Sequence, residues 1–138
     1  MDRKDKEIIF SLLKDARMPK LKIAEKLGVS ETAIRKRIER LENQRILIGY
    51  RALVDYKKTG LLASFTGIDV EPEQMWKVMN TLKDFEEIFN LYLTSGDHTI
   101  LAEIITDSLD KMNELHERIA KISGVKRVCP AVILEVVK

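Results

Sequence analysis

The sequence predicts an α+β protein built from an N-terminal helical half and a C-terminal half of mixed strands and helices. The first observation behind this prediction is a pair of apolar-striped helical segments separated by a glycine turn within residues 21–42. The second is a regular order of strand-like and helix-like segments from residue 61 onward. The third is a division of charge: residues 1–60 carry 16 Lys and Arg against 9 Asp and Glu, and residues 61–138 carry 8 against 13. Such a division favours two functional halves, the basic one suited to a polyanion.

The stretch from Leu21 to Glu42 has the pattern of a helix-turn-helix. Gly28 ends the first helix of the pair, where a positive φ is easiest for glycine, and Val29 fills the turn. Ser30 is placed to cap the second helix through its side-chain oxygen. The apolar stripes of the two helices are formed by Ile23, Ala24 and Leu27 and by Ile34, Ile38 and Leu41.

The face of the second helix opposite its apolar stripe is a candidate DNA-binding surface. Short hydrogen-bonding groups and cations on one helical face suit a helix that lies in the major groove. We expect Thr32, Arg35 and Lys36 to contact base edges and Arg37, Arg40 and Arg45 to contact phosphates. The competing interpretation is an amphipathic surface helix whose charges are only solvated. The full candidate set is Ser30, Glu31, Thr32, Arg35, Lys36, Arg37, Arg40 and Arg45.

Segments on either side of this motif complete the N-terminal half. Residues 2–15 have a helical apolar period, and Pro19 is suited to start the helix at about 20–27. Residues 46–54 are enriched in strand formers and predict a strand or small hairpin that serves as a wing or a connecting arm. We therefore expect a helix-turn-helix domain over 1–45, a strand or hairpin linker over 46–60, and a second domain over 61–138.

The pattern of the second domain predicts six elements in the order β-α-β-β-α-β, which is the order of a ferredoxin-like sandwich. The last strand of that topology lies at a sheet edge, where Pro130 loses no ladder hydrogen bond. The expected strands are 62–70, 88–95, 99–106 and 128–137, and the expected helices are 73–84 and 108–122.

The predicted strands are apolar on both faces, as in Phe89, Leu91 and Leu93 against Ile88 and Tyr92. Helices can cover only one face of such a sheet, and an open apolar face is an aggregation hazard. The sequence therefore predicts a homodimer formed through the sheet. A dimer would also pair two recognition helices on a palindromic DNA site.

Composition limits the class of protein. With 45% hydrophobic and 33% charged residues, the chain is typical of a soluble globular protein. No apolar run approaches the ~20 residues of a membrane span, and the N-terminus lacks the apolar core of a signal peptide. Cys129 is the single cysteine, so no intramolecular disulfide is possible. We expect a cytoplasmic protein that does not contact a membrane.

Taken together, these motifs resemble the Lrp/AsnC (leucine-responsive, or feast/famine) family of prokaryotic transcription regulators. The match is carried by Ile23-Ala24, Leu27-Gly28-Val29-Ser30, Ile34, Arg37-Ile38, Leu41-Glu42, Ile46-Leu47-Ile48-Gly49-Tyr50, Ser95-Gly96-Asp97 and Ile122-Ser123-Gly124-Val125. The resemblance implies a regulator that binds double-stranded promoter DNA as a dimer, often assembled into tetramers or octamers.

The resemblance also implies an amino-acid effector bound at the turn between the two middle strands of the second half. Backbone N–H groups around Gly96 would hold a carboxylate, and Asp97 an ammonium group. Family members often carry an aromatic residue and a second aspartate after Gly-Asp, where this chain has His98 and Thr99. The alternative is a hairpin turn that uses Gly and Asp for backbone geometry alone. The candidate effector residues are Thr94, Ser95, Gly96, Asp97 and His98.

Enzymatic and metal chemistry have no sequence signature here. Neither His98 nor His116 has a cysteine or carboxylate pair at metal-ligand spacing in the sequence. There is no nucleophile–base arrangement and no glycine-rich phosphate loop. We therefore expect no metal, no cofactor and no catalysis. The remaining alternative is an amino-acid-binding protein whose DNA-binding half is vestigial.

Overall fold

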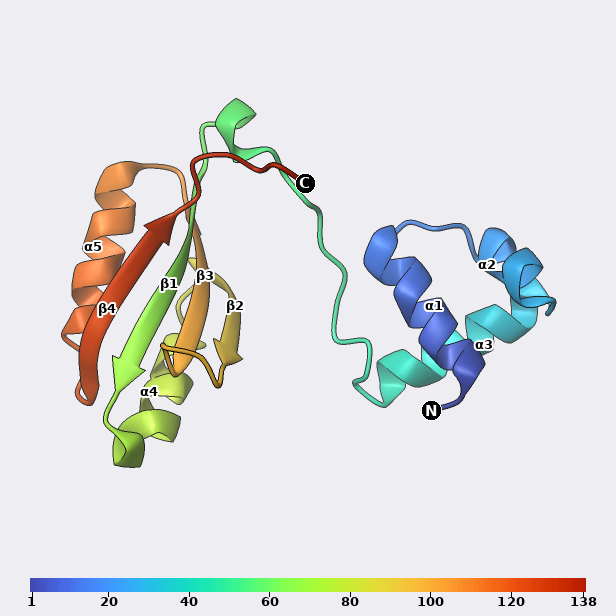
Figure 1. Cartoon of the computed structure of the whole chain (residues 1–138), viewed down its shortest axis with the longest axis horizontal. Coiled ribbons are helices and arrows are strands. Elements are labelled where there is room, and N and C mark those ends of the chain that lie inside the picture. The colour runs from blue at the N-terminus through green and yellow to red at the C-terminus, as the bar shows by residue number, and fades with distance from the viewer. The chain divides into compact units, whose positions relative to one another are not determined.

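A computed structural model describes residues 1–138 and divides the chain into two compact units, Met1–Leu53 and Val54–Lys138 (Figure 1). Each unit has its own hydrophobic core. No helix in either unit combines the length and the apolar character that crossing a membrane requires.

The first unit consists of three helices, α1 (Arg3–Lys14), α2 (Lys20–Leu27) and α3 (Glu31–Asn43). One buried cluster joins all three, because the apolar stripe of each helix faces the other two. Its members are Ile8, Leu12, Ile23, Ala24, Ile34, Ile38 and Leu41. The predicted helix-turn-helix and the helix that precedes it are confirmed.

Local hydrogen bonds fix the ends of these helices. The side chain of Asp2 accepts from the backbone N–H of Asp5 at 2.9 Å, and Asp5 accepts in return from the Asp2 N–H, which forms a capping box. Gly28 ends α2 in the left-handed conformation, with φ of 64°. Ser30 caps α3 by accepting from the Ala33 N–H at 3.1 Å. The turn between α2 and α3 is therefore closed from both sides.

The strand or hairpin predicted within residues 46–60 is not formed, so the helix-turn-helix has no wing in the single chain. A strand requires a neighbour for its backbone hydrogen bonds, and this chain places none beside residues 46–54. The Tyr50 hydroxyl instead donates to Glu42 of α3 at 2.7 Å, and partial burial together with this bond raises the pKa of Tyr50 to about 12. A short 3₁₀ helix, Tyr56–Lys58, follows in the second unit.

The second unit is a four-stranded antiparallel sheet in the order β2-β3-β1-β4, which confirms the predicted ferredoxin-like topology. Helices α4 and α5 pack on one face of the sheet and form a single core with it. The elements are β1 (Leu62–Val70), a 3₁₀ turn (Pro72–Gln74), α4 (Met75–Leu82), β2 (Ile88–Leu93), β3 (Ile100–Thr106), α5 (Leu109–Ala120) and β4 (Val125–Val132).

The last strand differs from the expected 128–137: it begins at Val125 and ends at Val132. Its only neighbour is β1, which begins at Leu62 opposite Leu134, so residues beyond Leu134 have no strand to pair with. Pro130 lies opposite Thr66 in this edge strand, as predicted. The expected 73–84 helix is likewise shorter: a 3₁₀ turn, Pro72–Gln74, precedes α4, which spans Met75–Leu82.

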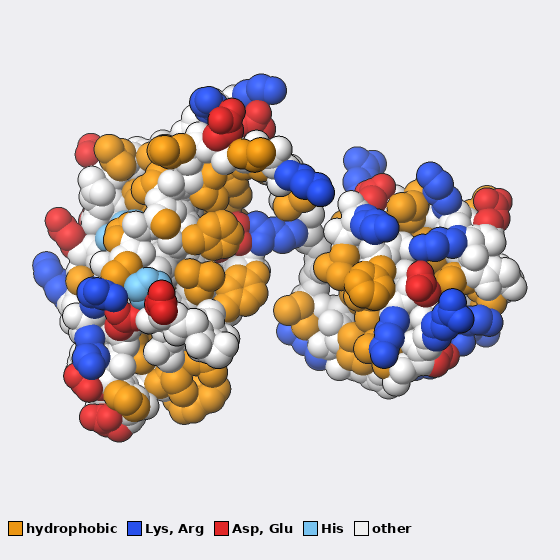
Figure 2. All heavy atoms as spheres, viewed as in Figure 1, with side chains coloured by type: hydrophobic (Ala, Val, Ile, Leu, Met, Phe, Trp, Pro, Cys, Tyr) orange, Lys and Arg blue, Asp and Glu red, His pale blue; other side chains and the backbone are white.

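The sheet face that carries no helices remains open to solvent. Residues at every second position of β1, including Phe65 and Gly67, lie on this face, and Phe65 is 40% exposed. Figure 2 shows hydrophobic side chains gathered over the sheet of this unit. Tyr92, opposite Leu101 in the β2–β3 ladder, is another exposed side chain on this face.

Candidate nucleic-acid interface and effector turn

The outward face of α3 presents the residues that the sequence assigned to base contact. Thr32, Arg35 and Lys36 are all exposed, while Ile34 and Ile38 on the opposite side are buried. Arg35 is 62% exposed and pairs with Glu31 one turn earlier at 2.7 Å. An exposed pair of this kind is weak in water, so the guanidinium is easily released to a nucleic acid.

Unlike Arg35, Arg37 and Arg40 are held by carboxylates at the start of α1. Arg37 donates to Asp2 at 2.7 Å and to Asp5 at 2.8 Å, and only 26% of its side chain is exposed. Arg40, 48% exposed, donates to the second oxygen of Asp5 at 2.6 Å. The Asp5 side chain is only 3% exposed, so this cluster is an ionic junction between α1 and α3.

Hydrogen bonds at this junction lower the pKa of Asp2. Its pKa is lowered to about 2, first by the hydrogen bond from the Asp5 backbone and then by Arg37. Hydrogen bonds to the side chains of Asp2 and Asp5 in turn raise the pKa of Arg37. Sequence periodicity identified Arg37 and Arg40 as cations near the outward face but gave no sign of their partners, which lie 32 to 35 residues away.

Arg45 follows α3 in the left-handed conformation, with φ of 57°. The Ile46 N–H donates back to the Leu41 carbonyl at 2.9 Å, which closes the helix C-terminus. The exposed Arg45 side chain extends the row of cations past the end of the helix.

The turn between β2 and β3 is organised by Thr94. Its backbone N–H donates to the Thr99 carbonyl at 2.8 Å, and its hydroxyl donates to the His98 carbonyl at 2.5 Å. The same hydroxyl oxygen accepts from the Gly96 N–H at 3.2 Å. Ser95, Gly96 and Asp97 at the tip are exposed. A carboxylate ligand would therefore have to compete with Thr94 for the Gly96 N–H.

His98 does not lie with the tip of this turn. Its ring sits over Gly67 of β1, where a Cβ atom on that glycine would collide with it. His98 Nδ1 is 2.9 Å from Asp69 Oδ1, and the other oxygen of Asp69 accepts from Arg127 of β4 at 2.9 Å. These two partners, His98 first, lower the pKa of Asp69.

Cys129 joins this group, so that ligand atoms of Asp69, His98 and Cys129 all lie within 4.8 Å of one another. No metal-ligand spacing joins these three residues in the sequence, because they come from β1, the 94–99 turn and β4. Only antiparallel pairing of β1 with both β3 and β4 brings these segments together.

The second histidine is structural. His116 of α5 shares a 2.8 Å hydrogen bond with the Thr66 hydroxyl, which is in turn 2.8 Å from the Ser64 hydroxyl. Burial lowers the pKa of His116. This arrangement satisfies polar side chains between the sheet and α5.

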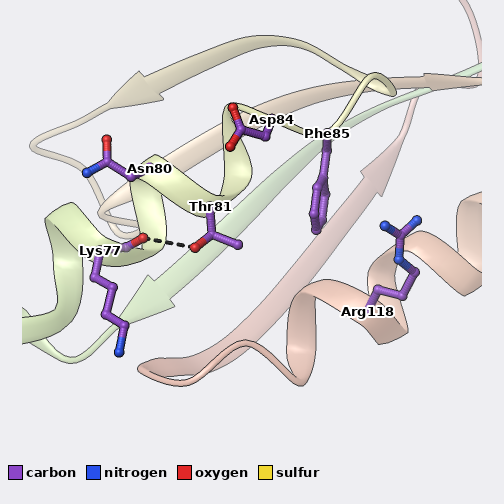
Figure 3. Close-up of a pocket in the computed structure, with 6 residues that line it drawn as sticks. All are labelled: Lys77, Asn80, Thr81, Asp84, Phe85 and Arg118. Carbon is purple, nitrogen blue, oxygen red and sulfur yellow. Dashed lines mark hydrogen bonds between the residues drawn. The ribbon is translucent and has the colours of Figure 1, made fainter.

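A shallow hollow lies on the helical side of the second unit, between the end of α4 and α5 (Figure 3). Phe85 and Arg118 face each other across it, with the guanidinium 4.8 Å from the ring centroid. The Thr81 hydroxyl donates to the Lys77 carbonyl. Arg118 Nη1 lies 3.8 Å from Glu87 Oε1 and forms an ion pair with it. None of the predicted site residues lines this hollow.

Comparison with known proteins gives matches over both units. Residues 1–42 match the family described as the AsnC-type helix-turn-helix domain, and residues 63–138 match the Lrp/AsnC ligand binding domain. The HTH-type transcriptional regulator LrpA of Pyrococcus horikoshii is 47% identical over 140 residues, which cover 100% of this chain and 99% of that protein. LrpA of Pyrococcus abyssi is 46% identical with the same coverage.

Solved structures share the fold over the full length. The Mycobacterium tuberculosis leucine response regulatory protein (LrpA) aligns with a TM-score of 0.77 at 25% identity, covering 100% of this chain and 95% of that one. The Neisseria meningitidis transcriptional regulator NMB0573, solved as its L-Met complex, aligns with a TM-score of 0.72 at 17% identity, covering 100% and 92%.

Proposed function

The chain belongs to the Lrp/AsnC family of DNA-binding transcriptional regulators, and from this premise we propose that α3 reads the operator. The observation that carries the proposal is the exposed outward face of α3, with Thr32, Arg35 and Lys36 on one side of a helix whose other side is buried. A helix whose start is fixed by a capped glycine turn can hold such a face against base edges.

The cations of α3 divide into two roles under this proposal. Arg35 and Lys36 contact base edges, where Arg prefers the paired acceptors of guanine. Arg40 and Arg45, both exposed, contact phosphates. Arg37 acts as a positioning residue, because its guanidinium already holds two carboxylates of α1.

The experiment is a fluorescence-anisotropy titration against duplex from upstream of the protein's own gene and a scrambled duplex, at two salt concentrations. We expect the native duplex to bind ~10³-fold or more tightly, with affinity that falls as salt rises. Arg35→Ala should cost ~1–3 kcal/mol at one base position, whereas Arg40→Ala should weaken binding to all sequences alike. Lys111→Ala, which removes an exposed cation of α5, is the matched control. It should change neither the affinity for the native duplex nor that for the scrambled duplex.

Equal losses on native and scrambled DNA for Arg35→Ala and Arg40→Ala would contradict this division of roles. Absence of binding to either duplex at low salt would favour the alternative, an amino-acid-binding protein with a vestigial DNA-binding half. The relatives named above support the regulator over that alternative, since they are transcriptional regulators.

The proposed assembly is a homodimer formed through the open face of the sheet. Exposed Phe65 and Tyr92 on this face support it, since exposed aromatic side chains on an uncovered sheet face are typical of protein–protein interfaces. A two-fold pair would present two copies of α3 to half-sites about one helical turn apart or a multiple of it.

Sedimentation equilibrium of Phe65→Glu tests the dimer, with Trp76→Glu as the matched control. Trp76 is an aromatic residue that is 65% exposed on α4, in the helical layer rather than on the open face. We expect Phe65→Glu to shift the protein toward monomer and Trp76→Glu to leave the assembly unchanged. A dimer that survives Phe65→Glu and dissociates with Trp76→Glu would place the interface on the helices.

The proposed effector is an amino acid bound at the 94–99 turn. The description of the C-terminal match as a ligand binding domain and the L-Met complex of the Neisseria regulator support this. In this chain Asp97 is exposed at the tip of the turn, so its carboxylate is accessible to an ammonium group.

Amino acids added one at a time to the protein–operator complex test this proposal, with anisotropy as the readout. We expect at least one amino acid to change operator affinity in the parent protein, and Asp97→Ala to abolish the response. Asp84→Ala, an exposed carboxylate of the helical layer, should respond as the parent does. An unchanged response in Asp97→Ala would remove that residue from the site.

A further inference from the structure

Three metal-ligating side chains meet on the open face of the sheet. Asp69 of β1, His98 of the turn and Cys129 of β4 each offer one ligand atom, and these atoms all lie within 4.8 Å of one another. All three residues are partly buried. In Figure 1 the end of β1, the turn between β2 and β3 and the start of β4 lie at the same end of the sheet.

Gly67 makes room for this group. It lies directly opposite Cys129 in the β1–β4 ladder, and the neighbouring Thr66 and Ile68 point toward the helices, so Gly67 points toward the open face. A side chain at this position would occupy the space that the His98 ring fills. The missing Cβ therefore allows an imidazole to lie between the carboxylate of Asp69 and the thiol of Cys129.

We propose that Asp69, His98 and Cys129 form a Zn²⁺ site that fastens the 94–99 turn to β1 and β4. One oxygen, one imidazole nitrogen and one thiolate form a ligand set that Zn²⁺ accepts, with a fourth position left to water. Ligand atoms around tetrahedral Zn²⁺ are about 3.3–3.6 Å apart, given the usual bond lengths. Asp69 and His98 are already 2.9 Å apart, so side-chain adjustments on the order of 1 Å complete the site.

Arg127 supports the carboxylate from outside the group. It donates to Asp69 Oδ2 at 2.9 Å, which leaves Oδ1 directed toward His98. Hydrogen bonds of this kind orient metal-binding carboxylates and are part of a working site. Zn²⁺ would bind the His98 Nδ1 that now faces Asp69 and would deprotonate the Cys129 thiol, so that binding releases a proton.

The test is a titration of the full-length, metal-free protein with Co²⁺, which takes the place of Zn²⁺ and reports its ligands in its absorption spectrum. We expect visible bands of tetrahedral Co²⁺ together with a near-ultraviolet sulfur-to-cobalt charge-transfer band, both lost on adding Zn²⁺. Because Cys129 is the only cysteine, the charge-transfer band can come from no other residue. Cys129→Ser should abolish that band, and His98→Gln and Asp69→Asn should each lower Zn²⁺ affinity by at least about 100-fold, since even supporting residues are worth 10–100-fold.

His116→Gln is the matched control, because His116 is the only other histidine and lies on the helical side of the sheet. Circular dichroism of every variant establishes that it is folded. An unchanged spectrum in His116→Gln with the losses above supports the site. The proposal is overturned if the parent protein shows no charge-transfer band, if the band survives Cys129→Ser, or if His98→Gln binds Zn²⁺ as tightly as His116→Gln.

Discussion

Removing the carboxylate of Asp5 should destabilise the DNA-binding unit more than any other single change of charge in α1. The Asp5 side chain is 3% exposed and accepts from Arg37 at 2.8 Å and Arg40 at 2.6 Å. Each hydrogen bond to a charged group is worth about 1.5–3 kcal/mol. Arg37 keeps Asp2 as a partner, and Arg40 is half exposed and can be resolvated, so we expect Asp5→Ala to cost about 2–3 kcal/mol in total.

Hydrogen exchange at the backbone amides of α3 measures this cost in the full-length chain, because it reports the opening of that helix alone. A loss of about 2–3 kcal/mol makes the slowest amides exchange about 30- to 150-fold faster. Glu7→Ala is the control on the same helix: Glu7, which is partly exposed, pairs with the exposed Lys26 at 3.3 Å. That variant should accelerate exchange by less than about threefold. Equal acceleration in the two variants would refute the junction between α1 and α3.

Three further changes test other parts of the structure. Gly28→Ala places a side chain at φ of 64° in open space, so backbone strain alone should lower the free energy of unfolding by about 1–2 kcal/mol. The urea midpoint should fall accordingly, and an unchanged midpoint would contradict this prediction. Gly67→Ala should push the His98 ring off Asp69, shifting the imidazole NMR signals of that histidine and leaving those of the other; unmoved signals would show that the ring adapts. The pKa of Asp2 falls from 3.8 to about 2 on folding, so its stabilisation is present above the unfolded value and is lost as acid approaches pH about 2. The melting temperature of Asp2→Asn should therefore depend less on pH between about 4 and 2 than that of the parent, and parallel curves would argue against the capping box.

Much of the fold could be predicted because its signals are local. The stripe of Ile34, Ile38 and Leu41 specifies which side of α3 is buried, and Gly28 and Ser30 specify where the turn begins and ends. The topology of the second unit follows from the order of its elements, and Pro130 correctly identified an edge strand. These features depend on side-chain period and backbone preference, which a sequence displays directly.

The wrong predictions concern pairing rather than propensity. Residues 46–54 have the composition of a strand, but no neighbouring strand is present to receive their hydrogen bonds. The last strand ends at Val132 although apolar residues continue to Val137, and beyond Leu134 β1 offers no partner. Composition favours a strand, whereas only the arrangement of neighbours allows one to form.

The sequence by itself determined the two halves, the order of their helices and strands and the outward face of α3, because each depends on residues within a few turns of one another. Tertiary structure alone decided that Arg37 binds Asp5 and that Cys129 meets His98 and Asp69. The partners in these groups lie about thirty to sixty residues apart in the chain, and their approach depends on strand register and helix packing that no local pattern encodes.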